Sequence, residues 1–158
     1  MSEPLRAVEI AILDARLTSW GFPRWASAAS AGLDLHACLD APIELEPQAP
    51  AILIPAGFAL MIRDPEWCGF VFARSGRGHR EGLVLGNGTG VIDADYEGPL
   101  LISAWNRNPG PSGSIRIEPG DRIAQLVFSR VSRPELTVVG RSEPASERGG
   151  GGFGSSGR

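Results

Sequence analysis

Proline and glycine interrupt this chain too often for long regular elements to form. The sequence holds 13 prolines and 21 glycines among 158 residues, and they divide it into short apolar segments. Proline lacks the backbone donor that helices and sheet ladders need, and glycine favours turns. Because turn residues recur roughly every 8 to 12 positions, the pattern is typical of an all-β sandwich or barrel.

The segments that read as strands are rich in β-branched and aromatic side chains. They cover residues 8–13, 51–54, 58–62, 69–72, 83–85, 100–105, 114–117, 123–128 and 136–139. Residues 64–68 suggest a short helical turn, with Asp64 as its cap and Pro65 at its first position. We therefore expect one β domain over residues 1–141 and an extended arm, rich in Pro, Gly and Ser, over residues 142–158.

Charge and hydropathy argue against two classes of partner. A net charge of −3 provides no global basic field for nucleic acid. The longest apolar stretch, residues 49–62, is broken by two prolines and a glycine, so we expect no membrane span. The first residues lack the pattern of a secretion signal. Cys38 and Cys68 fit the reduced thiols of a cytoplasmic protein.

The segment Arg148–Arg158 combines six glycines and two serines with two arginines and one phenylalanine. Such a composition cannot bury enough apolar surface to order its own backbone, so we expect it to be mobile. Two interpretations remain open from composition alone. The segment is either a plain flexible linker, or a lid in which arginine binds phosphate and Phe153 stacks on a base.

The segment 86–98 is the second unusual stretch. Asn87 and Gly88 predict a type I′ hairpin, whose backbone groups can pair with the edge of a pyrimidine. We expect Asp93 and Asp95 to share one face of a strand, with Tyr96 on the other face. Two carboxylates at a strand end are ordinary on a protein surface, so the residues alone leave their role open.

Three weaker signals accompany these segments. Residues 73–78 form a short, basic, glycine-rich stretch in which a serine hydroxyl and free amides can hold phosphate oxygens. Asp34 stands between two leucines and either faces a metal-bound water or sits on a turn. Gln125 interrupts an apolar strand, and its buried amide needs a ligand or, more commonly, a backbone carbonyl as partner.

Taken together and in this order, five segments resemble the motifs of the trimeric dUTP diphosphatases (dUTPases) of bacterial type. The resemblance covers residues 8–158, and its motifs are residues 31–35, 74–76, 90–96, 120–125 and 148–157. It implies a jelly-roll subunit and a homotrimer with three active sites at subunit interfaces. It also implies Mg²⁺-dependent hydrolysis of dUTP at the α-phosphate to dUMP and pyrophosphate, which limits uracil in DNA and supplies dUMP for dTMP synthesis.

The resemblance assigns roles to single residues. Asp93 would orient and deprotonate the attacking water, and Gln125 would lie near the α-phosphorus. Tyr96 would lie under the deoxyribose, where a 2′-hydroxyl would clash, and Asn87 with the neighbouring backbone would read uracil. The implied substrate-binding residues are Arg74, Ser75, Gly76, Asn87, Val91, Asp93, Tyr96, Gln125, Arg148 and Phe153.

The resemblance also implies how magnesium is bound and which subunit supplies each part. The substrate phosphates would hold most of the Mg²⁺ shell, with Asp34 acting indirectly through water. Arg148 would bind the γ-phosphate and Phe153 would stack on uracil, both on the arm of another subunit. The expected partners are therefore dUTP and further copies of this chain, with no nucleic acid and no membrane.

Two departures and two rival functions matter. Ala73 replaces the usual proline, and Arg77 stands where an apolar residue is usual. Arg77 either adds a phosphate contact or is solvated, and we expect it to be solvated. A dCTP deaminase, which is similar in fold, would carry a catalytic glutamate on the strand after the third motif, and residues 100–106 contain none. A non-catalytic nucleotide-binding trimer would be marked by a damaged motif, whereas Asp93, Tyr96 and Phe153 are all present.

Overall fold

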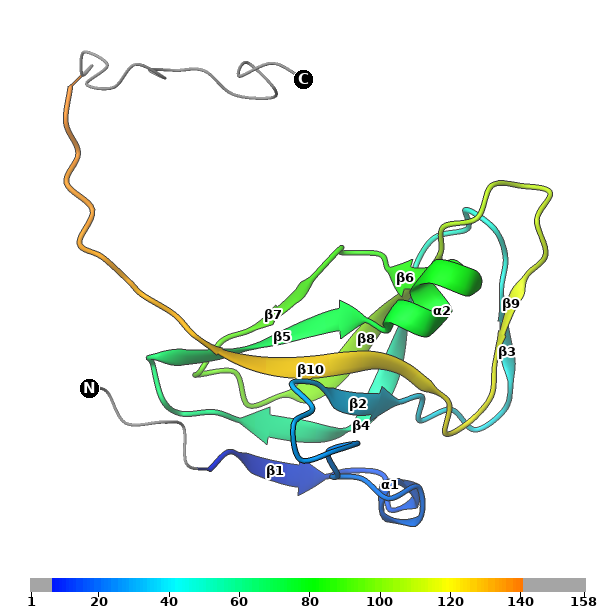
Figure 1. The fold of residues 1–158 in the computed structure, drawn as a ribbon, viewed down its shortest axis with the longest axis horizontal. Helices are drawn as coiled ribbons and strands as arrows, with labels where there is room; N and C mark the ends of the chain where they lie inside the picture. The colour runs from blue at the N-terminus through cyan, green and yellow to red at the C-terminus, as the bar shows by residue number, and fades with distance from the viewer. Residues whose placement is uncertain (1–6, 141–158) are drawn as a thin grey trace.

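The computed structural model describes residues 7–140, which form two four-stranded sheets and a separate two-stranded ladder (Figure 1). The chain is therefore an all-β, jelly-roll-like sandwich, as the sequence predicts. One sheet has the order β1 (Glu9–Ile12), β4 (Ile52–Met61), β8 (Pro99–Asn106) and β6 (Leu83–Leu85). The second has the order β2 (Leu33–His36), β10 (Arg122–Arg130), β5 (Trp67–Ala73) and β7 (Gly90–Ile92), and β3 (Ile43–Leu45) pairs with β9 (Ile115–Ile117).

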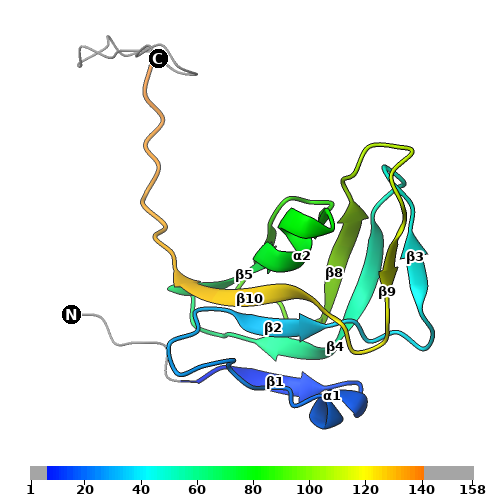
Figure 2. The ribbon, with the colours of Figure 1, turned by 45° about the vertical axis from the view of Figure 1, so that its right-hand side comes forward.

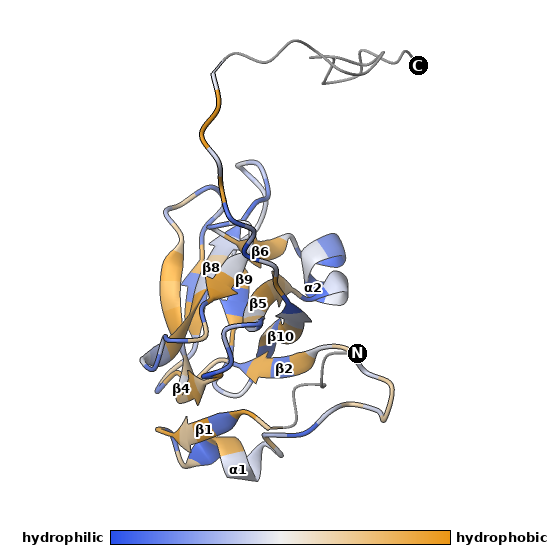
Figure 3. Cartoon of the chain, turned by 90° about the vertical axis from the view of Figure 1, so that its left-hand side faces the viewer, coloured by the Kyte–Doolittle hydropathy of each residue, from blue (hydrophilic) through white to orange (hydrophobic). Residues whose placement is uncertain are grey.

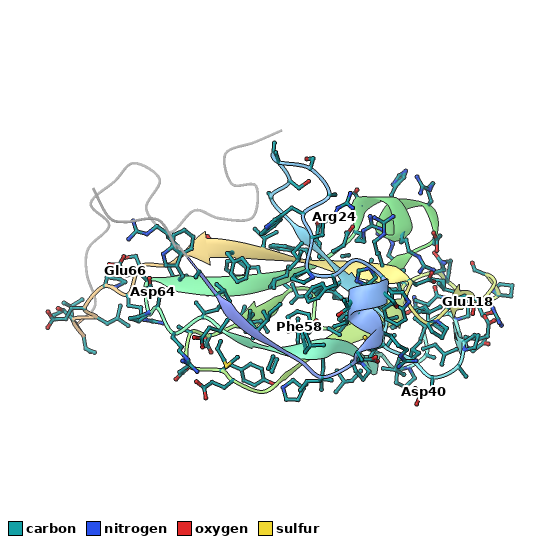
Figure 4. All side chains as sticks on the ribbon, turned by 90° about the horizontal axis from the view of Figure 1, so that it is seen from below. Arg24, Asp40, Phe58, Asp64, Glu66 and Glu118 are labelled. Atoms are coloured by element: carbon teal, nitrogen blue, oxygen red, sulfur yellow. The ribbon has the colours of Figure 1, made fainter. Side chains whose placement is uncertain are left out.

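The core lies between the two larger sheets. Leu35 and Leu126 enter it from the second sheet, and Phe58 and Ile102 enter it from the first, all at most 1% exposed. Figure 4 shows Phe58 inside the body. Each such side chain stabilises the fold by roughly 1.5–3 kcal/mol through burial. Because strand side chains alternate, the opposite face of β2 and β10 is left for polar residues.

The pairing register of β10 positions the polar face of the second sheet. Gln125 lies opposite Asp34 of β2 on one side and Phe72 of β5 on the other. Leu33 and Leu35, the neighbours of Asp34, are buried. Asp34 and Gln125 therefore stand side by side on the outer face.

Two sequence predictions for the first half of the chain are wrong in detail. Residues 51–54 and 58–62 form one strand, β4, rather than two, with an irregularity between Pro55 and Ala59. Gly57 makes this possible, because its positive φ of 80° and its close approach to Cys38 exclude a side chain. The chain thus bends within the strand and does not leave the sheet.

The only predicted helix is a turn, and the two helices of the described residues lie elsewhere. Asp64 does cap the turn, accepting a hydrogen bond from the Glu66 amide at 2.9 Å, but β5 then begins at Trp67. Helix α1 spans Arg16–Ser19, and helix α2 spans Ser75–Arg80. Two glycines within α2 lower its intrinsic helix propensity, which is why the sequence alone did not indicate it.

The type I′ hairpin at Asn87 and Gly88 is also wrong. The flanking strands do not pair with each other, since β6 pairs with β8 and β7 pairs with β5. Of the two turn residues only Gly88 has a positive φ, 72°, whereas a type I′ turn needs both. The turn therefore carries the chain from one sheet to the other.

After β10 the described chain leaves the body as an extended arm, residues 131–140 (Figures 1 and 2). The predicted strand at 136–139 is not formed, because no neighbouring strand of the described residues lies beside it. Leu136, Val138 and Val139 are 86%, 98% and 70% exposed, and Figure 3 shows this apolar stretch away from the body. Neither helix within residues 7–140 has the length and apolarity needed to cross a membrane.

Candidate active site

Helix α2, β2 and β10 surround a hollow of about 630 Å³ that is strongly basic. We call it the arginine cradle, after the four arginines that line it: Arg74, Arg77, Arg80 and Arg122. Asp34, Ser75, Gly76 and Gln125 complete its polar wall. Residues from three of the five predicted motifs therefore meet in one place.

Asp34 links two of these arginines. Its side chain is 19% exposed, with one carboxylate oxygen 2.8 Å from Arg74 Nε and the other 3.1 Å from Arg122 Nη1. Both guanidinium groups are thus held against the outer face of the sheet. An arginine that is already oriented loses less side-chain entropy when it binds an anion.

Gln125 is anchored by the backbone, as predicted for a buried amide. Its Nε2 donates to the Ala73 carbonyl at 3.0 Å. The other side of the amide packs so closely on Gly32 that a Cβ at this position would collide with it. Glycine at position 32 therefore leaves room for the Gln125 side chain to lie against the backbone in the cradle.

The loop at the start of α2 presents Ser75 and Gly76 to the same hollow. Arg74 is extended, with φ of −80° and ψ of 135°, and its carbonyl accepts the Gly78 amide at 2.8 Å. The amides of Ser75 and Gly76 precede this first helical bond, so the helix itself does not use them. Arg107 supports the helix from below by donating to the Gly78 carbonyl at 3.0 Å.

Arg77 is not solvated, which corrects the sequence expectation. Its side chain is only 16% exposed and makes ion pairs with Glu81 at 2.8 Å and Asp121 at 2.9 Å. A third contact runs from Arg77 Nη2 to the Arg116 carbonyl at 3.0 Å. Arg77 therefore fastens α2 to the turn that leads into β10.

The third predicted motif forms a second hollow of about 210 Å³, lined by Val91, Asp93, Tyr96 and the residues around Pro99. Tyr96 donates its hydroxyl to the Pro99 carbonyl at 2.9 Å. The ring lies so close to Gly98 that a side chain there would displace it. The tyrosine thus forms a fixed wall beside Asp93.

The expectation that Asp93 and Asp95 share a strand face is wrong. Strand β7 ends at Ile92, and the next residues form a turn in which the Tyr96 amide donates to the Asp93 carbonyl at 3.2 Å. Asp93 lines the second hollow, and Asp95 does not. The turn therefore gives the two carboxylates different surroundings, although the sequence predicted a shared strand face.

Within one chain the two hollows do not meet. Ile92, next to Asp93, pairs with Gly69 of β5, and Gln125 of β10 pairs with Phe72 of the same strand. Strand β5 therefore lies between Gln125 and Ile92. Strand spacings then separate the Cα atoms of Ile92 and Gln125 by about 14 Å. Asn87 is exposed on the turn before β7, and it lines neither hollow.

The sequence analysis missed Arg80 and Arg122 as residues of the cradle. Arg122 could have been found because it lies within the motif segment 120–125. Arg80 could have been found because it stands four residues after Gly76, on the same face if this segment is helical. Two predicted residues, Arg148 and Phe153, lie outside the described residues. Within residues 7–140, no group of three or more His, Cys, Asp or Glu side chains is placed to hold a metal ion.

Comparison with known proteins identifies the family. The sequence matches the dUTPase family over residues 18–157. The deoxyuridine 5′-triphosphate nucleotidohydrolase of Xanthomonas oryzae pv. oryzae (strain MAFF 311018) is 51% identical over 158 residues, 99% of each chain. That of Xanthomonas campestris pv. campestris (strain B100) is 52% identical over 153 residues, 96% of this chain and 97% of the relative.

Solved structures agree with the sequence relatives. The Staphylococcus bacteriophage 80alpha dUTPase with dUPNHPP superposes with a TM-score of 0.82 at 31% identity, covering 96% of this chain and 99% of that chain. A mutant dUTPase from phage phi11 of S. aureus, described with a coordinated structural Mg(II) ion, has a TM-score of 0.72 at 25% identity, covering 87% and 99%. A jelly-roll-like fold, a basic cradle at three of the motifs and these full-length relatives all agree: the chain belongs to the dUTPase family.

Proposed function

We propose that this chain is a dUTP diphosphatase, a hydrolase that converts dUTP to dUMP and pyrophosphate by attack of water at the α-phosphorus. Full-length relatives at 51% identity that are named deoxyuridine 5′-triphosphate nucleotidohydrolase carry this proposal. The enzyme would limit the uracil available for DNA and supply dUMP for dTMP synthesis.

The arginine cradle is the site for the triphosphate. Guanidinium groups bind phosphate oxygens through paired hydrogen bonds, and Arg74 and Arg122 are already oriented by Asp34. The Ser75 hydroxyl and the Gly76 amide add uncharged donors beside them. Gln125, fixed on Ala73, lies where the α-phosphorus and its attacking water would be held.

The donor set of the cradle fits a magnesium ion that arrives with the triphosphate. Each Asp34 oxygen already accepts from an arginine, yet a carboxylate has about four lone-pair sites, so water-mediated contact remains possible. Bound to the phosphates, Mg²⁺ would neutralise their oxygens and favour departure of pyrophosphate. Asp34 would then hold a magnesium-bound water while it continues to orient the two arginines.

The second hollow supplies the base and the selection of the sugar. Asp93 would accept the proton of the attacking water, and a carboxylate in this role needs only hydrogen-bond reach to that water. The fixed Tyr96 ring would pack under the deoxyribose and exclude a 2′-hydroxyl. Asn87 and the backbone near Val91 would read the uracil edge.

A homotrimer would bring the two hollows together. Within one chain the Cα atoms of Gln125 and of Ile92, which precedes Asp93, are about 14 Å apart, too far for a single water to join Asp93 to a phosphate beside Gln125. The exposed apolar side chains of Leu136, Val138 and Val139 support an arm that packs on another copy. We propose that this arm continues from the described residues 131–140 through residues 142–158, with Arg148 on the γ-phosphate and Phe153 on uracil.

The cellular setting follows from the thiols. Cys38 and Cys68 are both buried and unbonded. We place the enzyme in the cytoplasm, where such thiols stay reduced.

Release of pyrophosphate from dUTP, with ammonia from dCTP measured in parallel, tests the function. The proposal expects pyrophosphate from dUTP and no ammonia from dCTP. Ammonia would identify a deaminase, and binding of dUTP without release of either product would identify a non-catalytic nucleotide-binding protein.

A further inference from the structure

Arg80 differs from the other three arginines of the cradle in having no hydrogen-bond or ion-pair partner among the described residues. Arg74 and Arg122 share the Asp34 carboxylate as ion-pair partner, at 2.8 and 3.1 Å. Within residues 7–140, Arg80 makes neither an ion pair nor a side-chain hydrogen bond, although it lines the same hollow. Among the described residues, Arg80 is therefore the one arginine of the cradle whose guanidinium has no carboxylate beside it.

The position of Arg77 sharpens this contrast. Arg77 lies one turn earlier on α2, but its guanidinium already binds Glu81, Asp121 and the Arg116 carbonyl. A phosphate would have to break these contacts to bind Arg77. Binding to Arg80 breaks no protein contact among the described residues.

The Arg80 guanidinium also lies over the phosphate-binding loop. A Cβ built on Gly76 would stand only 3.1 Å from Arg80 Nη2 and 3.6 Å from Arg80 Cζ. Glycine at position 76 therefore leaves room for the arginine to fold back over the loop. This places a free cation within reach of any anion that the loop amides hold.

We propose that Arg80 binds a phosphate oxygen of the substrate directly, with a guanidinium that is not shared with a protein carboxylate among the described residues. The proposal rests on the cradle being the triphosphate site of the proposed function. It makes Arg80 a binding residue for the polyphosphate, and not for the base or the sugar. Arg77 then acts as a positioning residue that holds α2, and with it Arg80, over the sheet.

Arg80→Met tests this because it keeps most of the unbranched apolar stem and removes the charge. Loss of a charge-assisted contact should weaken binding of the analogue dUpNHpp and of inorganic tripolyphosphate by roughly 10- to 100-fold. Inhibition by deoxyuridine, which has no phosphate, should stay unchanged. Arg80→Lys should recover part of the lost affinity, since a point charge replaces the fork.

Arg116→Met is the matched control for the loss of one positive charge. Its side chain is 58% exposed and pairs with Glu44 and Glu118, away from the residues that line the cradle. Tripolyphosphate binding by this variant should equal that of the wild type. Equal tripolyphosphate affinity in Arg80→Met and wild type would overturn the proposal, and so would an equal loss of deoxyuridine affinity, which indicates a disturbed fold.

Wild-type turnover of dUTP is measured first, so that failure of the proposed activity can be told apart from failure of the phosphate-binding role of Arg80. Absence of turnover would contradict the proposed function. The tripolyphosphate titration would still decide the role of Arg80, because it needs neither base nor catalysis.

Discussion

Asp34 is a single residue with a large effect on the cradle. Its carboxylate pairs with both Arg74 and Arg122. The negative charge between them reduces the repulsion between the two guanidinium groups that face the hollow. A pre-organised donor set binds a polyanion with less loss of conformational entropy than free surface arginines would. Asp34 thus serves the phosphate site chiefly through its neighbours.

Asp93→Asn should separate chemistry from binding. The substitution keeps the shape of the side chain and removes the proton acceptor, so kcat for dUTP should fall by about 10²–10⁴-fold. Affinity for dUpNHpp should persist, because loss of a carboxylate removes no attraction for a polyanion. Steady-state kinetics and a binding titration on the same preparation measure both effects.

Asp95→Asn is the control for this prediction. Asp95 belongs to the same turn, but it does not line the second hollow with Asp93 and Tyr96. It should retain more activity than Asp93→Asn. A more severe loss in Asp95→Asn would show that the base has been assigned to the wrong carboxylate.

His36 should make stability depend on pH. It is 7% exposed and stacks on Trp20, with ring centroids 5.9 Å apart. Burial lowers its pKa below the ordinary 6.5; Asp34 opposes this shift, and the positive charges of Arg122 and Arg74 assist it. The native state therefore takes up this proton less readily than the unfolded state.

The sign of the effect follows from that difference. Above about pH 6.5 both states hold His36 neutral, so its contribution is constant. As the pH falls below this value, the unfolded state binds the proton first and the free energy of unfolding decreases. Urea unfolding at about pH 7.5 and about pH 5.5, at one protein concentration, should show a smaller decrease for His36→Gln than for the wild type.

The carboxylate of Asp14 does not contribute to the change in stability between about pH 7.5 and about pH 5.5. Arg16 hydrogen-bonds Asp14 and lowers its pKa from 3.8 to about 2, so Asp14 destabilises the fold only at much lower pH. An identical decrease in wild type and His36→Gln would assign the pH dependence to other groups.

At the scale of elements, α2 is held in place by Arg77. Its removal would leave Glu81 and Asp121 without their cation and the Arg116 carbonyl without its donor. Arg77→Met should therefore lower the free energy of unfolding by about 1–3 kcal/mol, as expected for the loss of charged hydrogen bonds. Urea unfolding measures the change.

Arg116→Met provides the comparison for Arg77→Met as well. Its ion pairs are exposed, so its effect should stay within about 1 kcal/mol. Equal stabilities of Arg77→Met and the wild type would mean that α2 does not depend on this clamp.

The elements that the sequence predicted well are strands rich in β-branched, aromatic and other apolar side chains. Strand β8 alternates buried and exposed residues along most of its length, and Phe58 marks a strand that faces the core. Turn chemistry was less informative. Asn87 and Gly88 read as a hairpin, but local propensity cannot tell whether the flanking strands pair with each other or with different sheets.

The sequence predicted which residues belong to the candidate site better than it predicted their contacts. Residues Asp34, Ser75 and Gln125 do meet in the cradle, as their resemblance to motifs implied. The burial of Arg77 was missed, because its partner Asp121 lies 44 positions away in the sequence. Long-range ion pairs of this kind leave no periodic signal in a single sequence.

At the scale of the whole molecule, one chain holds two separate hollows, which we propose are two halves of one site, and an arm whose described residues 136–139 pair with no strand. The cradle lies beside β2 and β10, while Asp93 and Tyr96 lie beyond the far edge strand β7. A closed oligomer repeats such a heterologous contact until every half-site has a partner. The account therefore predicts that activity belongs to the assembly and not to the single chain.

Complementation between two inactive variants tests this claim most directly. Asp93→Asn lacks the base, and the double variant Arg74→Gln, Ser75→Ala lacks a working cradle. Each should be nearly inactive alone. When the two are co-expressed in equal amounts and assemble at random, about one quarter of the sites should join an intact cradle to an intact Asp93.

The measurement is dUTP turnover by the co-expressed protein, with light scattering to confirm a trimer. The account predicts recovery of about one quarter of the wild-type activity in the whole co-expressed population, which corresponds to about one working site in each mixed trimer. Mixed trimers with no more activity than either variant alone would contradict the shared site and place all catalytic groups within one chain.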